Sequence, residues 1–390
     1  MSKTQTALMI GAPLAIGSLV LALLWRTYVV DTPGARDHAP GVTARDTTRS
    51  RDDAGEGATE SSRELTLYSS ADDEYLRLVL DRFTAKTGVK VEAVGDTEAT
   101  KTFGLVRRLI AEKDRPRADV WWSSEPMSSI SLAEAGVLAP MDPAPRLDDA
   151  TPWPSELRDG EGRWFAFARR ARVIVYSTSR VKDAEAPTHL RDLLDPRWKS
   201  RVGMARPQFG TTRTHLAALV ALAGEARAET WLSALRDHGV RLYDGNAAVV
   251  RGIANAEIDV GLTDSDDVFA GLRNGWAVSM TFEPRDAEPA GVDGLPSFGT
   301  IMLPNTVGVI RKPGGVSKDA RALADFLLSA EVETILAESD SRNVPVRAAL
   351  AKVQAEKDPR TRVAEPASPD LSAVSRASPA AAAIADRVLK

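Results

Sequence analysis

The stretch EIDVGLTDSDD, residues 257–267, decides the fold. Its first half is an apolar strand that runs directly into three carboxylates, Asp264, Asp266 and Asp267. In open α/β sheets the ligand crevice lies just outside the carboxyl ends of the strands, so this acid cluster is interpreted as part of a binding site. The same residues also fit a helix start, in which Asp264 or Ser265 is the cap and the other acids favour the positive end of the helix.

Short apolar strands alternate with longer helical patterns on both sides of this stretch. Strands are expected at residues 64–68, 90–94, 118–122, 172–176, 202–205, 241–243 and 258–262. Amphipathic or apolar helices are expected between them, at 75–83, 102–112, 128–135 and from about Thr212. This βαβ alternation predicts an α/β fold with mainly parallel sheets and flanking helices. Two lobes with a cleft between them fit the two series of strands.

Composition and missing motifs exclude several classes of function. The 390 residues carry a formal net charge of -4 and no cysteine. This charge gives no field that would attract nucleic acid. The lack of cysteine excludes disulfides, thiolate metal sites and a cysteine nucleophile. The chain has no Gly-x-Ser-x-Gly, phosphate-loop or His-Glu-x-x-His motif, so we expect no enzymatic activity.

The two ends of the chain are expected to lie outside the folded lobes. Residues 7–25 contain no charge, so residues 1–30 are predicted to be an N-terminal transmembrane anchor or an uncleaved signal. Residues 31–62 have almost no large apolar side chains and are predicted to be a disordered tether. Residues 351–390 are rich in alanine and proline and are predicted to be a mostly disordered tail, with room for a frayed helix at 380–389.

Several phrases in a fixed order carry a resemblance to a known family. They are YSS at 68–70, FTAKTGVKV at 83–91, ADVWW at 118–122, EAGVL at 134–138, RARVIVY at 170–176, FGTT at 209–212, the strand at 257–262 and NTVGVI at 305–310. Together they resemble the type II periplasmic solute-binding proteins of ABC importers, in the group similar to ferric-iron-binding proteins.

The resemblance implies a two-lobe fold, with a hinge where the chain crosses near residues 167–175 and 300–309. Residues 63–170 would begin lobe 1, residues 171–300 would form lobe 2, and residues 301–350 would return to lobe 1. It also implies a monomer outside the cytoplasmic membrane, tethered there by the N-terminal segment. Such a protein captures a small ligand, needs no cofactor, and hands the ligand to an ABC permease in the membrane.

The chain departs from this family at the acid cluster. Ferric-binding members that use tyrosinate carry two adjacent tyrosines where this sequence has Asp266 and Asp267, and no two of its five tyrosines are adjacent. Carboxylates suit hard cations, so Asp266 and Asp267 are predicted metal ligands, joined by other acids if the lobes bring them together. The ligand therefore stays open between iron(III) or another hard cation, alone or with an anion, and a small phosphorylated solute.

Polar strand ends and helix starts complete the candidate site. The glycine and hydroxyls at 210–212 would let a helix N-terminus seat an anion, with Arg170 and Arg172 adding positive charge. Each of these groups also fits an ordinary helix cap or a structural ion pair. The candidate ligand-binding residues are Ser70, Asp72, Glu98, Thr102, Ser124, Glu125, Arg170, Arg172, Gly210, Thr211, Thr212, Asn246, Asp264, Asp266 and Asp267.

Two other classes of function compete with the binding protein. A ligand-sensing ectodomain would use the same cleft and present its closed form to a signalling partner. A metal-dependent hydrolase would use Asp264, Asp266 and Asp267 to hold a divalent ion that activates water.

Overall fold

The computed structural model describes residues 63–390 except 72, 96–102, 149, 209 and 287–293. These residues belong to one compact unit that begins at Glu60. The predicted anchor and tether lie outside the described residues, as do the candidates Asp72, Glu98 and Thr102. Among the residues that the structure describes, none of the helices is both long and apolar enough to pass through a bilayer.

The first half of the sheet has the order β2-β1-β3-β10-β5. Its first three strands are parallel, and β10 runs antiparallel to β3. The bounds are β1 (Glu64–Ser69), β2 (Lys90–Gly95), β3 (Val120–Ser123), β4 (Leu138–Ala139), which also pairs with β10, and β10 (Thr300–Ile310). This parallel arrangement confirms the predicted βαβ rhythm of the first lobe.

The second half continues as β5-β8-β6-β7, in which β8, β6 and β7 are parallel. Its strands are β5 (Phe165–Ser177), β6 (Val202–Ala205), β7 (Arg241–Tyr243), β8 (Val260–Asp264) and β9 (Val278–Thr281), which pairs with β5. A short β11 (Pro366–Ala367) pairs with the start of β10. The strand at the opening stretch is therefore central in its lobe, between β5 and β6.

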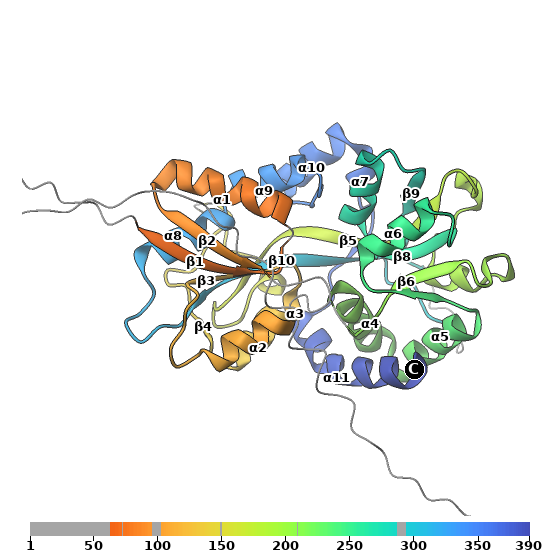
Figure 1. Ribbon diagram of the computed structural model, residues 1–390, viewed down its shortest axis with the longest axis horizontal. Coiled ribbons are helices and arrows are strands. Elements are labelled where there is room, and N and C mark those ends of the chain that lie inside the picture. The colour runs from red at the N-terminus through yellow and green to blue at the C-terminus, as the bar shows by residue number, and fades with distance from the viewer. Residues whose placement is uncertain (1–62, 72, 96–102, 149, 209, 287–293) are drawn as a thin grey trace, which may run out of the picture. The chain divides into compact units, whose positions relative to one another are not determined.

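Helices flank each half (Figure 1). Those around the first are α1 (Asp73–Thr87), α2 (Phe103–Ala111), α3 (Pro126–Glu134), α8 (Lys318–Leu327), α9 (Ala330–Glu338) and α10 (Ala348–Lys357). Those around the second are α4 (Gly210–Ala223), α5 (Glu225–Asp237), α6 (Asn246–Ala254), α7 (Ser265–Arg273) and α11 (Leu371–Val388). Short 3-10 helices lie at Ser155–Leu157, Asp183–Glu185, Leu190–Leu194, Pro196–Trp198 and Pro359–Thr361.

Strands β5 and β10 belong to both halves. The first part of β5 pairs with β10, and its last part pairs with β8 and β9. The register of β5 and β10 shifts between Pro304 and Asn305, and Ala168 opposite this shift has a φ of 43°. The pairing of β5 with strands of both halves fits a crossing near residues 167–175, and the two crossings between lobes stay predictions. A hinge at this irregular point stays a prediction.

The core of the first lobe is aromatic. Trp121 and Trp122 are adjacent on β3, and both are fully buried because helices cover both faces of this sheet. The Trp122 ring packs at 5.4 Å from Phe167 on β5 and at 6.0 Å from Tyr75 on α1. These contacts fix the end of β3 beside the crossing strands, where Ser124 and Glu125 follow.

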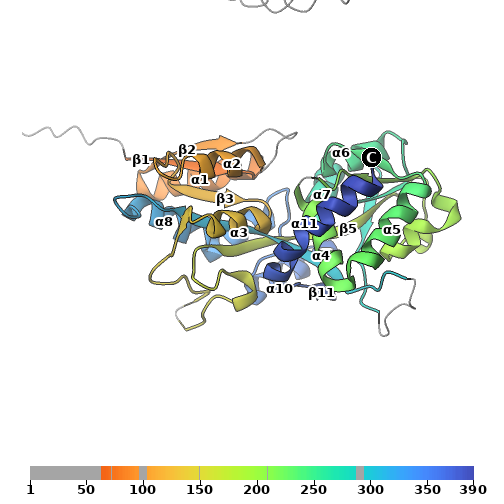
Figure 2. The same ribbon diagram turned by 90° about the horizontal axis from the view of Figure 1, so that it is seen from below.

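The last helix corrects an expectation from the sequence. Residues 351–390, expected to be a mostly disordered tail, contain the end of α10, β11 and the whole of α11. Val374, Ala381 and Ala385 recur along one face of α11 and are buried. Figure 2 shows α11 lying against α4 and α5, with its first turns near α3. The alanine-rich composition hid a buried face that also contains Leu371, Ile384 and Val388.

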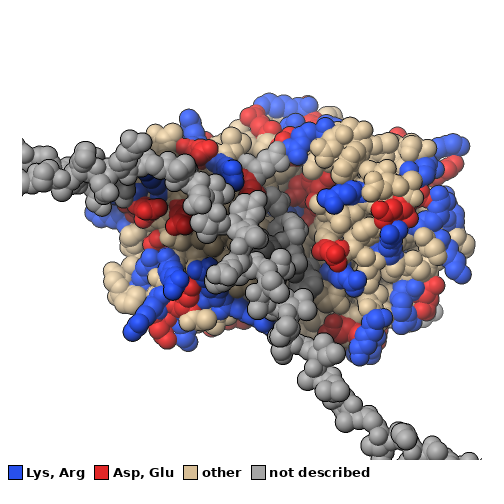
Figure 3. All heavy atoms as spheres, viewed as in Figure 1, with Lys and Arg blue, Asp and Glu red and all other residues tan. Residues whose placement is uncertain are grey.

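On the face drawn in Figure 3, basic and acidic side chains are interspersed and neither kind predominates. Many of them pair at the surface, as Arg387 of α11 does with Glu229 of α5 (2.7 Å). Exposed pairs of this kind contribute little to stability.

Gly261 lies on β8 where neighbouring strands and helices leave no room for a side chain. A Cβ at Gly261 would lie 2.7 Å from Val249 Cγ1 on α6 and 2.9 Å from the Gly203 carbonyl oxygen on β6. Gly261→Ala is expected to lower the free energy of unfolding by about 2 kcal/mol through overpacking. Gly160→Ala, where no atom lies within 4 Å, is the control and should change it by about 0.5 kcal/mol or less. Urea unfolding measures both, and equal losses would contradict the packing.

Candidate functional site

Three helices of the second lobe begin at the same edge of the sheet. α4 follows β6 and begins at Gly210, α6 follows β7 and begins at Asn246, and α7 follows β8 and begins at Ser265. The three strands are parallel neighbours, so their carboxyl ends meet. Each helix brings unpaired backbone N–H groups and the positive end of its dipole to this edge.

Arg172 lies where these helix starts converge. It faces Asp264 across the β5–β8 ladder, and its Nη1 donates to Asp264 Oδ1 at 2.7 Å. Both side chains are 2% exposed. The same Nη1 lies 3.2 Å from Asn246 Oδ1 and 3.4 Å from Thr211 Oγ1. The guanidinium therefore connects β5 with the first residues of α4 and α6.

Asp264 is the internal counter-ion of this arrangement. Its second oxygen, Oδ2, accepts from Thr211 Oγ1 at 2.5 Å and from Asn246 Nδ2 at 3.0 Å. Both carboxylate oxygens thus have partners, and the negative charge offsets Arg172 and the nearby helix ends. A charge buried this completely is tolerated only when it is paired and hydrogen bonded.

A second ion pair lies two residues earlier on β5. Arg170 and Arg172 alternate with Ala171, so they point to the same side of the strand. Arg170 Nη1 lies 3.1 Å from Asp266 Oδ2 on α7, and its Nη2 donates to the Tyr75 hydroxyl on α1 at 3.4 Å. Because α1 belongs to the first lobe and α7 to the second, Arg170 makes contacts to both sides of the cleft.

Asp264, Asp266 and Asp267 form the acid cluster predicted from the sequence. One oxygen from each lies within 4.8 Å of the others, a span that a single hard cation could bridge. Asp267 Oδ2 also accepts from Thr263 Oγ1 at 3.2 Å. With the two guanidiniums included, this group carries a formal charge of -1. A cation that took these carboxylates would have to displace arginine from two of them.

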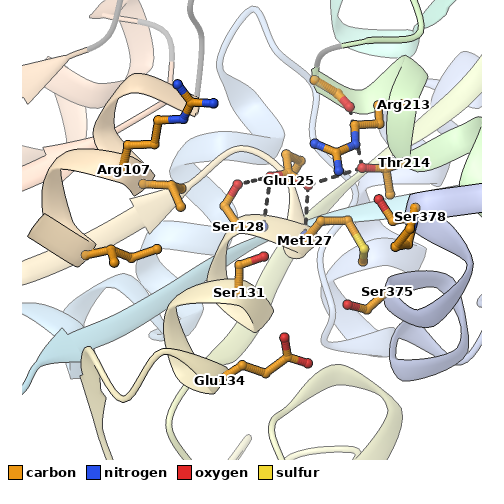
Figure 4. A pocket seen from close by; sticks show the side chains of 14 residues that line it. Arg107, Glu125, Met127, Ser128, Ser131, Glu134, Arg213, Thr214, Ser375 and Ser378 are labelled. Atoms are coloured by element: carbon orange, nitrogen blue, oxygen red, sulfur yellow. Dashed lines mark hydrogen bonds between the residues drawn. The ribbon is translucent and has the colours of Figure 1, made fainter. Parts of the chain in front are cut away.

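Glu125 connects the lobes on the other side of the cleft. It caps α3 by accepting from the backbone N–H groups of Met127 (2.8 Å) and Ser128 (3.0 Å). Its Oε2 also accepts from Thr214 Oγ1 on α4 at 3.1 Å (Figure 4). These bonds occupy both oxygens of Glu125, which acts here as a cap and an interlobe contact.

The structure thus divides the described candidates into two groups. Around Arg172 it brings together Arg170, Thr211, Thr212, Asn246, Asp264, Asp266 and Asp267, with Thr212 Oγ1 donating to Asn246 Oδ1 at 3.1 Å. Ser70 and Ser124 lie with Glu125 at the end of β3, their hydroxyls 3.2 Å apart. Gly210 opens α4 with a φ of 55°, a conformation that suits glycine.

Sequence reasoning missed three residues of this region, namely Tyr75, Thr214 and His215. Thr214 and His215 follow Thr211 by three and four positions, so they share its face of α4. That spacing could have indicated them. Tyr75 could not be found this way, because only the tertiary fold brings α1 to Arg170.

His215 is buried beside Arg172. Burial is the main cause that lowers its pKa well below the usual value, and the positive charge of Arg172 lowers it further. The ring is therefore neutral at physiological pH. Arg172 Nε and Nη2 are buried as well, and no partner for them occurs among the described residues.

Comparison with known proteins shows what the chain resembles. A family model described as "Bacterial extracellular solute-binding protein" matches residues 117–261. The "Major ferric iron-binding protein" of Neisseria meningitidis is 30% identical over 215 residues, which are 53% of this chain and 60% of that protein. "Iron uptake protein A1" of Synechocystis is 28% identical over 287 residues, 71% of this chain and 74% of that protein. The chain thus spans about 60% of the first curated relatives that it matches.

Solved structures give the same fold. Iron-bound HitA from Pseudomonas aeruginosa has a TM-score of 0.66 at 25% identity, covering 84% of this chain and 99% of that one. The ferric binding protein from Campylobacter jejuni has a TM-score of 0.68 at 20% identity, covering 83% and 99%. The protein therefore has the fold of these ferric-binding structures, and over residues 117–261 it resembles the bacterial extracellular solute-binding proteins.

The ion pair of Arg172 and Asp264 can be tested by breaking it. Arg172→Met leaves a buried carboxylate without its counter-ion and is expected to lower the free energy of unfolding by about 3–5 kcal/mol. The double variant Arg172→Met with Asp264→Asn should lose less, because neither charge remains. Lys182→Met is the control at an exposed pair and should change stability by about 1 kcal/mol or less. All variants are measured by urea unfolding. A double variant less stable than Arg172→Met would contradict this role of Asp264.

The lowered pKa of His215 predicts a pH dependence. The folded protein keeps this ring neutral, while the unfolded chain binds a proton near pH 6.5. Its contribution to stability is therefore fully present above that pH and is lost as the pH falls, by up to about 1.4 kcal/mol per pH unit. The free energy of unfolding, measured with urea between about pH 7.5 and 5.5, should therefore fall less steeply with falling pH in His215→Gln than in the wild type. An unchanged slope would contradict the assignment.

Proposed function

We propose that the protein is the extracytoplasmic substrate-binding component of an ABC-type importer. It captures a small ligand between its lobes, carries out no chemistry on it, and delivers it to a permease in the cytoplasmic membrane. The family match and the names of its relatives, which include an "Fe(3+)-binding periplasmic protein" of Serratia marcescens, support this assignment. Tethering by the N-terminal segment and a monomeric state are parts of the same proposal.

The observation that carries the proposal is the pairing of two buried arginines with the acid cluster at the point where the strands cross. The ligand that fits it best is iron(III), or another hard cation, bound together with an anion. A cation that takes the oxygens of Asp264, Asp266 and Asp267 separates Arg170 and Arg172 from their counter-ions. A companion anion then satisfies the guanidiniums and the helix N-termini. A Trichodesmium protein of the same fold was solved "in complex with iron and citrate ligands".

A small phosphorylated solute without metal is the second candidate. It is favoured by the two buried nitrogens of Arg172, Nε and Nη2, that have no partner among the described residues. A phosphate at the start of α4 would meet this guanidinium and the hydroxyls of Thr211 and Thr212, with the acid cluster accepting from hydroxyl groups of the solute.

Capture is coupled to closure of the lobes in this proposal. Arg170 with Asp266 and Glu125 with Thr214 are contacts between residues on opposite sides of the cleft. Residues 63–170 and 301–350 would move as one lobe against residues 171–300. The irregular pairing at Ala168 and Pro304 is where few residues need change φ and ψ for such a movement.

Ligand-dependent thermal stability tests the proposal. Ferric citrate is expected to raise the unfolding midpoint, since a ligand at 100 times its Kd adds about 2.7 kcal/mol to stability. Asp267→Asn removes one carboxylate at nearly constant volume and should weaken ferric citrate binding at least about tenfold, as about 1.4 kcal/mol or more is lost. Asp244→Asn, an exposed acid beyond β7, is the matched control.

Different outcomes separate the candidates. Stabilisation by glucose 6-phosphate without metal would favour the phosphorylated solute, and insensitivity of ferric citrate binding to Asp267→Asn would contradict the cation site. Turnover of any bound compound would contradict a purely binding function.

A further inference from the structure

A cavity lies at the start of α4, where Glu125, Gly210 and Thr214 of the candidate site form part of its wall. It has a volume of about 400 Å³, is open on one side, and is lined by α2 and α3 of the first lobe, the first turn of α4, and α11 (Figure 4). None of the three clustered aspartates and neither Arg170 nor Arg172 lines it. Its volume falls in the range of about 300–1,000 Å³ that small-molecule sites occupy.

The inner wall of the cavity contains an unsatisfied polar group. Ser378 of α11 is 6% exposed and lines the cavity, and its Oγ has no hydrogen-bond partner in the part of the chain that the structure describes. A buried hydroxyl without a partner costs free energy, so such groups are uncommon unless something else satisfies them. A ligand in the cavity would supply the missing partner.

The rest of the lining combines apolar surface with charge. Met127 of α3 forms part of the wall, and Ile110 of α2, with 37% exposure, is among the large hydrophobic side chains that the described surface leaves exposed. Arg107 from α2 and Arg213 from α4 lie at one end in Figure 4, and Glu134 lies at the other. The oxygens of Glu125, between them, are occupied by the α3 cap and by Thr214.

We propose that this cavity is a second binding site, which takes a small organic anion with an apolar body. The anionic group lies at the end that carries Arg107 and Arg213, the apolar body covers Met127 and Ile110, and Ser378 Oγ donates to or accepts from a polar atom of the ligand. Because α2 and α3 belong to one lobe and α4 and α11 to the other, such a ligand contacts both lobes. It therefore favours the arrangement in which they are close.

A series of three probes with one body and different charge tests the ligand class. Phenylacetate, phenylacetamide and phenethylamine carry a negative, neutral and positive group, and their affinities for the full chain can be measured by ligand-observed NMR titration. Phenylacetate is expected to bind at least about tenfold more tightly than phenethylamine because of the two arginines. Absence of binding by all three probes, or tighter binding of the amine, would overturn the proposal.

Variants of α11 test the position of the site. Ser378→Ala should weaken phenylacetate binding about fivefold. Its thermal midpoint without ligand should be unchanged or higher, because the hydroxyl makes no bond that would be lost. Ser375→Trp should block the cavity, which Ser375 lines, whereas Ser372→Trp on the exposed side of the same helix should bind phenylacetate like the wild type.

The same variants separate this site from the importer ligand site. Ser375→Trp should bind ferric citrate as the wild type does, since α11 contributes nothing to the acid cluster. Wild-type affinity of Ser375→Trp or Ser378→Ala for phenylacetate would show that the probe binds elsewhere and would overturn the proposal. Loss of ferric citrate binding in every chain would count against the proposed importer ligand and leave the phenylacetate result standing.

Discussion

The charge of Arg172, buried where three helices begin, is the constraint on which the rest of the site depends. A guanidinium and three positive helix ends cannot share a dry interior unless negative charge is supplied there. Asp264 supplies it, and the β5–β8 pairing places the two side chains opposite each other. Thr211 and Asn246 are held by the same carboxylate, so the starts of α4 and α6 are fixed by one electrostatic requirement.

The resemblance implies that this site differs in charge from the site of family members that use tyrosinate. The resemblance places two adjacent tyrosines where this chain has Asp266 and Asp267, and the structure pairs Asp266 with Arg170. A carboxylate already paired with arginine exchanges one partner for another when a cation arrives. Under the proposed function the arginine then requires an anion, which would couple cation and anion binding through the same ion pairs. This coupling is the physical reason for proposing a ligand with both charges.

The sequence predicted the strand and helix alternation, and it placed Arg170 and Arg172 among the candidate site residues. It located Thr211, Asn246 and the aspartates near one edge because parallel strands end together. It could not predict which acid pairs with which arginine, since that depends on the register of β5 against β8. It left room for a helix only at 380–389, whereas α11 begins at Leu371 and packs against α4 with both large and small apolar side chains buried.

The central claim is that a cation and an anion enter the acid–arginine site together. It is tested most directly by equilibrium dialysis with doubly labelled ferric citrate, counting iron and citrate retained by the same protein. The account predicts that both are retained in equal amounts and that both are lost together when the arginine and aspartate pairs are removed. Phosphate and carbonate are removed beforehand, so that no other anion can replace citrate. Retention of iron without citrate would then contradict the claim.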